Sequence, residues 1–180
     1  MSKKVVVIST SLRANSNSNA LAEAFAKGAK EAGHEVEFIS LRGKRIEFCK
    51  GCLACQKTGS CVIQDDANEI TEKVLTSQVV AFATPIYYYE MSGQMKTLLD
   101  RMNALYSKDY AFRDVYFMAS AADEDAATPE RAINGLKGWI DCFEKAELKG
   151  SVFCGGVDRP GDAEGKPAVH QAYEMGRHVN

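Results

Sequence analysis

The stretch K-V-V-V-I-S-T-S-L-R-A-N-S-N-S, residues 4–18, decides how the rest of the chain is interpreted. Its first part, Lys4 to Ser9, is a short apolar and β-branched run, which is typical of a buried strand. The remainder is a loop of hydroxyl and amide side chains, followed by a pattern in which Leu21, Phe25 and Ala29 share one helical face. The stretch therefore predicts a strand, a polar loop and a helix, which together form the first unit of an α/β sheet.

The alternation of strand and helix continues to the end of the chain. Strands are expected over residues 4–9, 35–40, 78–84, 114–120 and 151–155. Helices are expected between the strands, and several residues mark where they begin or end. Gly33 ends the first helix, Asp66 and Glu69 form a capping box at the start of the next, and Ser92 is the N-cap of the one after it. Thr128 and Pro129 are the N-cap and the first residue of a fourth helix, and Pro167 begins the last. This pattern predicts a doubly wound α/β fold over residues 1–180, with a five-stranded parallel sheet in the order 2-1-3-4-5 and one domain.

Size and charge exclude several function classes. The chain has 180 residues, of which 46% are hydrophobic, so it can bury a sizeable core. Lys and Arg total 22 and Asp and Glu total 24, and a net charge of -2 gives no electrostatic footprint for nucleic acid. The longest apolar runs have the length of a strand, and the start lacks a secretory apolar region. We therefore expect no membrane span, no export and a cytoplasmic location.

The loop from Ser9 to Ser18 is the first candidate binding site, because ligands of such sheets bind at the carboxyl ends of the first and third strands. The loop holds five hydroxyls, two amides and Arg13, and no acid. It precedes a helix N-terminus, which favours an anion, so the loop predicts a phosphate site. The alternative is that these residues serve only as turn and cap residues. The loop has neither a Walker lysine nor a G-x-G-x-x-G pattern.

The loop after the third expected strand, T-P-I-Y-Y-Y-E-M-S at residues 84–92, is the second candidate. Three consecutive tyrosines cannot all face the core. Tyrosine suits the edge of a flat heteroaromatic ring, and the alternative is a dimer surface, which also favours tyrosine.

With these motifs the sequence resembles a known family. The matching pieces are T-S-L-R-A-N-S-N-S (10–18), T-P-I-Y-Y-Y (84–89), M-K-T-L-L-D-R (95–101) and C-G-G-V-D-R-P-G-D (154–162). Together they resemble the NADPH-dependent FMN reductase family, which has a flavodoxin-like fold of three α/β/α layers. The resemblance implies bound FMN, NAD(P)H as co-substrate, a small-molecule electron acceptor such as a quinone, an azo compound or free flavin, and a homodimer or homotetramer.

The resemblance also assigns cofactor-binding positions. Those of the phosphate loop are Ser9, Ser11, Arg13, Ser16, Asn17 and Ser18. Those along the ribityl chain and the ring are Thr84, Pro85, Ile86, Tyr87 and Tyr88, with Ser120 and Ala121 at the far side of the ring. The chemistry would belong to the flavin, so no catalytic side chain is assigned. Asp100 and Arg101 are expected to form an ion pair on a helix surface.

Four cysteines follow the second expected strand, with the spacing Cys49-x2-Cys52-x2-Cys55-x5-Cys61. Such a set can ligate an iron–sulfur cluster, hold structural zinc, or consist of free or redox-active thiols. The spacing and position resemble the motif of the iron–sulfur flavoprotein branch of the same fold. That resemblance implies a [4Fe-4S] cluster beside FMN and, as an alternative function, electron transfer. Cys142 and Cys154 are expected to be inert core residues.

Overall fold

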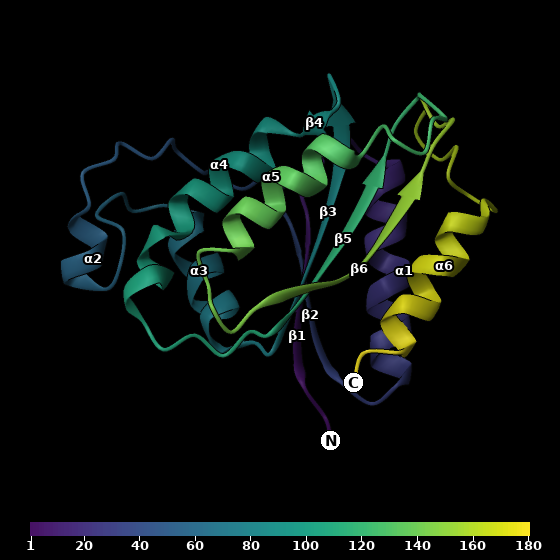
Figure 1. Ribbon diagram of the computed structural model, residues 1–180. Helices are drawn as coiled ribbons and strands as arrows, with labels where there is room; N and C mark the ends of the chain where they lie inside the picture. The colour runs from purple at the N-terminus through teal and green to yellow at the C-terminus, as the bar shows by residue number, and fades with distance from the viewer.

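The computed structural model describes residues 1–180 and contains a mainly parallel sheet between two layers of helices (Figure 1). The elements in chain order are β1 (Lys4–Ser9), α1 (Asn17–Glu31), β2 (Glu35–Ser40), α2 (Ala54–Thr58), α3 (Asp66–Thr76), β3 (Val79–Tyr87), β4 (Glu90–Met91), α4 (Gly93–Arg101), the 3-10 helix η1 (Met102–Ser107), β5 (Asp114–Ser120), α5 (Glu130–Ile140), β6 (Glu147–Cys154) and α6 (Pro167–Arg177). The parallel strands follow the order β2-β1-β3-β5-β6, and β4 pairs antiparallel with the end of β3. The predicted order is confirmed; the labels shift only because the short β4 was not expected.

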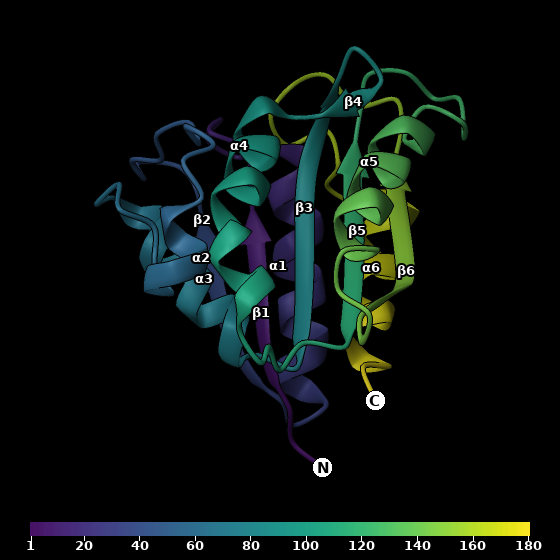
Figure 2. The same ribbon diagram turned by 60° about the vertical axis from the view of Figure 1, so that its left-hand side comes forward.

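Alternate residues of each strand face opposite helical layers, which gives the molecule two hydrophobic clusters. Val5 and Val7 of β1 belong to the cluster under α1 and α6, whereas Val6 and Ile8 belong to the cluster under α3, α4 and α5. Figure 2 shows α4 and α5 on one side of the sheet and α1 and α6 on the other. The strands are apolar on both faces because helices cover both faces.

Two glycines bring α1 and α6 into backbone contact. A Cβ atom added at Gly28 would lie 2.1 Å from the carbonyl oxygen of Tyr173, and one added at Gly176 would lie 2.1 Å from that of Phe25. No side chain fits at either position. The helix that begins at the polar loop is therefore fixed against α6 along its length.

The third strand continues farther than expected. It ends at Tyr87 and not at Thr84, so Pro85, Ile86 and Tyr87 are strand residues, and Pro85 is in register with Ser120 of β5. Tyr88 and Tyr89 then form a two-residue turn into β4, with φ angles of 52° and 65°. Positive φ at both central residues is the pattern of a type I′ hairpin, a turn that usually contains Asn-Gly.

Other boundaries also differ from expectation. The last strand begins at Glu147 and not at Ser151. The N-cap of α3 is Asp65 and not Asp66, and its carboxylate accepts a hydrogen bond from the N–H of Ala67. Pro129 occupies the N-cap position of α5, so Thr128 lies outside the helix. Ser92 is confirmed as the N-cap of α4. The short α2, within the cysteine-rich stretch, was not expected.

None of the helices is both long enough and apolar enough to cross a membrane.

Candidate functional site

A cavity of about 190 Å³ lies where the parallel strands end, and we call it the strand-end cavity. Its lining residues are Ser11, Arg13, Ser16, Asn17, Ser18, Pro85, Ile86, Tyr87, Ser120, Ala121, Ala122, Val157, Asp158 and Pro160. Three predicted segments therefore meet at one place, because the carboxyl ends of parallel strands share one edge of the sheet.

The polar loop offers hydrogen-bond donors to this cavity. Ser16 is the N-cap of α1, and its Oγ accepts from the N–H of Asn19 at 3.1 Å. The next N–H groups at this helix end, together with the helix dipole, favour an anion. Ser18 lines the cavity, and its Oγ is buried with no hydrogen-bond partner in the protein. A buried hydroxyl without a partner is costly, so this donor points to a ligand.

The loop after β6 forms a further wall. The guanidinium of Arg13 donates to the carbonyl oxygen of Asp158 at 2.8 Å. The amide of Asn17 donates to the carbonyl oxygen of Arg159 at 3.0 Å and accepts from the N–H of Ala163 at 3.0 Å. The side chain of Asn17 is therefore occupied in holding the two loops together.

A carboxylate stabilises this wall from within. Asp162 accepts hydrogen bonds from the N–H groups of Arg159 at 2.7 Å and Asp158 at 3.1 Å, and these bonds hold the pKa of Asp162 below its usual value. Sequence reasoning did not assign Ala122, Val157, Asp158 or Pro160 to the site. The C-G-G-V-D-R-P-G-D motif was the available signal for three of them.

Three expected binding residues lie outside the lining of the strand-end cavity. Ser9 is fully buried, and its hydroxyl has no partner. Thr84 is also buried; its Oγ1 accepts from the N–H of Ser92 and donates to the carbonyl oxygen of Pro85, each at 3.0 Å. Tyr88 lies at the tip of the hairpin and is 98% exposed. Thr84 therefore positions the start of α4, and Tyr88 projects into solvent.

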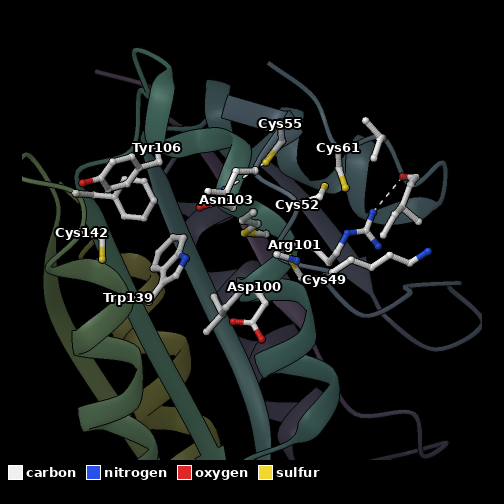
Figure 3. Close-up of a pocket in the computed structure, with 18 residues that line it drawn as sticks. Cys49, Cys52, Cys55, Cys61, Asp100, Arg101, Asn103, Tyr106, Trp139 and Cys142 are labelled. Atoms are coloured by element: carbon white, nitrogen blue, oxygen red, sulfur yellow. Dashed lines mark hydrogen bonds between the residues drawn. The ribbon is translucent and has the colours of Figure 1, made fainter. Parts of the chain in front are cut away.

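A second and larger cavity, of about 450 Å³, is lined by all four clustered cysteines, and we call it the cysteine cavity (Figure 3). Its further lining residues are Lys50, Gly51, Leu53, Val62, Ile63, Leu99, Asp100, Arg101, Met102, Asn103, Tyr106, Trp139, Cys142 and Phe143. Figure 3 shows Trp139, Tyr106 and Cys142 on one side of the cavity and the clustered cysteines with Arg101 on the other. Most of the wall is apolar.

The thiols line the cysteine cavity without converging on one point. Cys55 is buried, and its Sγ accepts from the amide of Asn103 at 3.2 Å, whereas Cys49 and Cys52 are exposed. No three His, Cys, Asp or Glu side chains lie close enough together to hold a metal ion as they stand. The donor set fits a thiolate-bound centre, and filling the cavity would require these side chains to turn inward.

Two expectations about this region are wrong. Arg101 is not on a helix surface: its side chain has no exposed area, and it pairs with Asp65 through two contacts of 2.5 and 2.8 Å. Asp100 pairs instead with Lys96, at 2.7 Å on the exposed side of α4. Cys142 is exposed and lines the cysteine cavity, whereas Cys154 is buried as expected.

The two cavities lie at opposite ends of the helical layer. The strand-end cavity is at the carboxyl edge of the sheet, near the start of α4. The cysteine cavity is lined by residues at the carboxyl ends of α4 and α5. A nine-residue helix spans about 13 Å, so the length of α4 separates the two regions within one chain.

The chain is similar to known proteins in sequence and in fold. The model of the family described as NADPH-dependent FMN reductase matches residues 3–156. An iron-sulfur flavoprotein from Methanosarcina thermophila is 30% identical over 155 residues, which are 86% of this chain and 81% of that protein. YwqN from Bacillus subtilis, whose name describes an NAD(P)H-dependent FMN-containing oxidoreductase, is 28% identical over 88% of each chain.

A solved structure shows the same fold. The NAD(P)H:quinone oxidoreductase from Methanothermobacter marburgensis superposes with a TM-score of 0.72 at 18% identity, over 100% of both chains. Three further relatives, all named iron-sulfur flavoprotein, match this chain over 45%, 53% and 55% of their own length, so the chain spans about half of these relatives. The resemblance stated from the sequence motifs is confirmed by the match over residues 3–156: the chain belongs to the NADPH-dependent FMN reductase family.

Proposed function

We propose that this chain is an FMN-dependent NAD(P)H oxidoreductase that reduces a small acceptor such as a quinone, an azo compound or free flavin, and that residues 1–180 form a single FMN-binding domain. The observation that carries the proposal is the strand-end cavity, whose lining includes Ser18, a residue with a buried hydroxyl that has no partner in the protein. When bound, FMN takes electrons from NAD(P)H and passes them to the acceptor.

The proposed roles of the polar loop follow from its contacts. The N-terminus of α1 and the hydroxyls of Ser11, Ser16 and Ser18 bind the phosphate. Arg13 adds positive charge and, with Asn17, holds the loop after β6 against the phosphate loop. The phosphate site is therefore built from two loops, and residues of both determine its shape.

The ring would lie at the open side of the cavity, between Pro85, Ile86 and Tyr87 and the segment that begins at Ser120. A volume of about 190 Å³ is below the range of roughly 300–1,000 Å³ that encloses a whole ligand, so part of the ring remains accessible to NAD(P)H and to the acceptor. The ionisable side chains of the lining are those of Arg13, Tyr87 and Asp158. The lining holds no histidine, the side chain most often used as a general acid or base, so we assign no side-chain general acid or base.

The test compares two serines that differ in one respect. The hydroxyls of Ser18 and Ser9 are both buried without a partner, but only Ser18 lines the strand-end cavity. Ser18→Ala removes a donor to a charged group, so FMN should bind about 1.5–3 kcal/mol more weakly, which is about 10–150-fold. Ser9→Ala should leave the affinity for FMN unchanged.

Fluorescence titration of flavin-free protein with FMN, and in parallel with riboflavin, measures both variants. Riboflavin lacks the phosphate, so its affinity should change little in Ser18→Ala. Equal affinities of the two serine variants for FMN would contradict the placement of the phosphate.

A second candidate function is electron transfer by an iron–sulfur flavoprotein. The observation that favours it is that Cys49, Cys52, Cys55 and Cys61 all line one largely apolar cavity. A [4Fe-4S] cluster would supply one-electron transfer there, with these four thiolates as its ligands. Cys55 is the buried member of the set, and the turn into α2 orients it toward Asn103.

Protein purified without oxygen distinguishes the two candidates. Flavin bands alone, without iron or acid-labile sulfide, would support the first function. A broad absorption that bleaches with reductant, accompanied by four iron and four sulfide per chain, would support the second.

A further inference from the structure

Arg101 is the best-connected buried charge in the molecule. It ends α4, and its side chain has no exposed area. One nitrogen of its guanidinium, Nη1, donates to Asp65 and to the carbonyl oxygen of Glu47 at 2.8 Å. The other, Nη2, donates to Asp65 and to the carbonyl oxygen of Ile63 at 3.1 Å.

The partners of Arg101 flank the cysteines on both sides. Glu47 precedes the first of them, and Ile63 and Asp65 follow the last, so one guanidinium joins both ends of the segment 47–65, which we call the cysteine loop. Asp65 reinforces this closure, because its carboxylate also accepts from the N–H groups of Glu47 at 2.8 Å and Ala67 at 3.1 Å.

The charge of Asp65 is maintained by these contacts. Burial by itself raises the pKa of the Asp65 carboxyl, but the hydrogen bonds from Arg101 and from the two N–H groups outweigh it, so the pKa lies below its usual value. The pair is therefore ionic over the physiological range of pH, and the cysteine loop is closed by a charged contact inside the protein.

One donor of Arg101 remains unused. Its Nε is buried and has no hydrogen-bond partner in the protein. Arg101 and Cys61 both line the cysteine cavity, and both also line a second, narrow crevice. Figure 3 shows the guanidinium close to Cys61, on the cysteine side of the cavity. Burial lowers the pKa of Arg101, but the interaction with Asp65 and, after it, the nearby sulfur of Cys61 outweigh burial, so the pKa lies above its usual value.

We propose that Arg101 is the positioning residue of the cysteine cavity: it joins the two ends of the cysteine loop, so that the four thiols face one space, and it keeps its Nε–H as a donor to an anionic, thiolate-bound group in that space. The closure of the loop rests on the contacts of Arg101 and Asp65, and it does not depend on what the thiols bind. The role of the Nε–H rests on the second candidate function, because it needs thiolates that carry a bound centre.

Arginine suits both tasks, and lysine does not. The planar guanidinium offers five donors in a fixed arrangement. The four hydrogen bonds described above use its two terminal nitrogens, two bonds from each. Lysine at the same place keeps the charge but has no second nitrogen and no Nε–H. Arg101→Lys therefore removes the geometry while preserving the charge, and it is the informative variant.

The control comes from the same helix. Lys96 forms an ion pair with Asp100 at 2.7 Å, but that pair is exposed and Lys96 does not line the cysteine cavity. Its partner Asp100 is in the lining of the cavity, but Asp100 forms no hydrogen bond or ion pair with the cysteine loop, so Lys96→Met removes an ion pair of α4 without breaking a contact of that loop. Any effect shared by the two variants belongs to the helix in general.

The experiment has three readouts: the first two use reduced, FMN-loaded protein from which other metals have been removed, and the third uses flavin-free protein. Amide hydrogen exchange should be about ten-fold faster over residues 47–65 in Arg101→Lys and unchanged in the central strands. Binding of Co²⁺, followed by its thiolate charge-transfer absorption, should weaken at least about ten-fold. The affinity for FMN should not change, and Lys96→Met should match the wild type in all three.

Each contrary result has a defined meaning. A folded Arg101→Lys variant with wild-type exchange in the cysteine loop would overturn the closure. Equal loss of protection in the loop and the strands, together with weaker FMN binding, would overturn it too, because Arg101 would then be a general stability residue.

A wild-type chain that binds no Co²⁺ would overturn the role of the Nε–H, and the second candidate function would lose support, while the exchange data would still decide the closure. If Arg101→Lys is insoluble, the role of the Nε–H is tested by nuclear magnetic resonance of this group in the wild type. Its signal should shift when Cd²⁺ binds, and an unchanged signal would overturn that role.

Discussion

The strand-end cavity is shaped by the sheet, whereas the cysteine cavity depends on the side chains of Asp65 and Arg101. In the strand-end cavity, the parallel pairing of β1, β3, β5 and β6 brings the loops to one edge of the sheet, and side-chain contacts adjust the positions of these loops. In the second, a long segment with one short helix is held at its two ends by a buried ion pair. The first site therefore follows from the fold, and we expect that the second can be lost while the fold remains.

The largest effect expected from this comparison is at the ion pair. Arg101→Met leaves the Asp65 carboxylate buried without its partner, so the free energy of unfolding should fall by about 3–5 kcal/mol. The double variant Asp65→Leu with Arg101→Met removes both charges and should recover most of that loss. Urea denaturation measures both. A loss in the single variant no larger than that of an exposed pair would contradict the ionic closure.

Acid should distinguish the two regions by a smaller effect. The folded pKa of Asp65 lies below its unfolded value, so its stabilising contribution is complete above the unfolded pKa, about 3.9, and is lost as pH falls through the folded pKa. Asp162 shifts in the same direction but is exposed, so its contribution is screened. Amide exchange below about pH 4 should therefore rise more in residues 47–65 than in residues 157–163. Equal increases would show that burial of Asp65 has no consequence.

The hairpin beside the strand-end cavity should become more stable on substitution. Tyr88 and Tyr89 both have positive φ, which costs roughly 1–2 kcal/mol for each residue that is not glycine. Asparagine relieves this cost only in part, and glycine relieves it but loses more backbone entropy on folding, so Tyr88→Asn with Tyr89→Gly should raise the free energy of unfolding by about 1–2 kcal/mol in flavin-free protein. Tyr106→Asn is the control, because Tyr106 is also exposed but has an ordinary φ. If Tyr106→Asn raised the free energy of unfolding by the same amount, backbone strain at Tyr88 and Tyr89 would not explain the result.

The smallest effect is expected when the cysteines are replaced. Serine at positions 49, 52, 55 and 61 should leave a folded protein whose affinity for FMN is unchanged, because the two cavities share no lining residue and distant sites are usually independent. Titration with FMN and the visible spectrum check this. Loss of flavin binding in the variant would show that the cysteine loop supports the strand-end cavity.

The sequence was sufficient for what depends on local periodicity. The apolar runs placed all five parallel strands, and the loops that follow them supplied ten of the lining residues of the strand-end cavity. The order of the strands also followed, because right-handed crossovers leave few alternatives. These features need no knowledge of distant partners.

Features that depend on distant partners were missed. In sequence, Asp100 and Arg101 are adjacent charges on a helix, and nothing local shows that Arg101 turns inward to Asp65, 36 residues away. The extension of β3 through Tyr87 depends on its pairing with β4 and β5, although proline usually interrupts a strand. Cys142 looked like a core residue because its exposure is decided by where α5 ends.

One side chain gives the cysteine cavity an optical reporter. Trp139 is the single tryptophan of the chain, and it lies on the wall of that cavity, stacked on Phe112 with ring centroids 5.7 Å apart and an angle of 15°. Its fluorescence therefore responds to the filling of the cysteine cavity by quenching, without any label. Flavin absorbs where tryptophan emits, so energy transfer from Trp139 to bound FMN would also measure, in solution, the separation between the two ends of the helical layer.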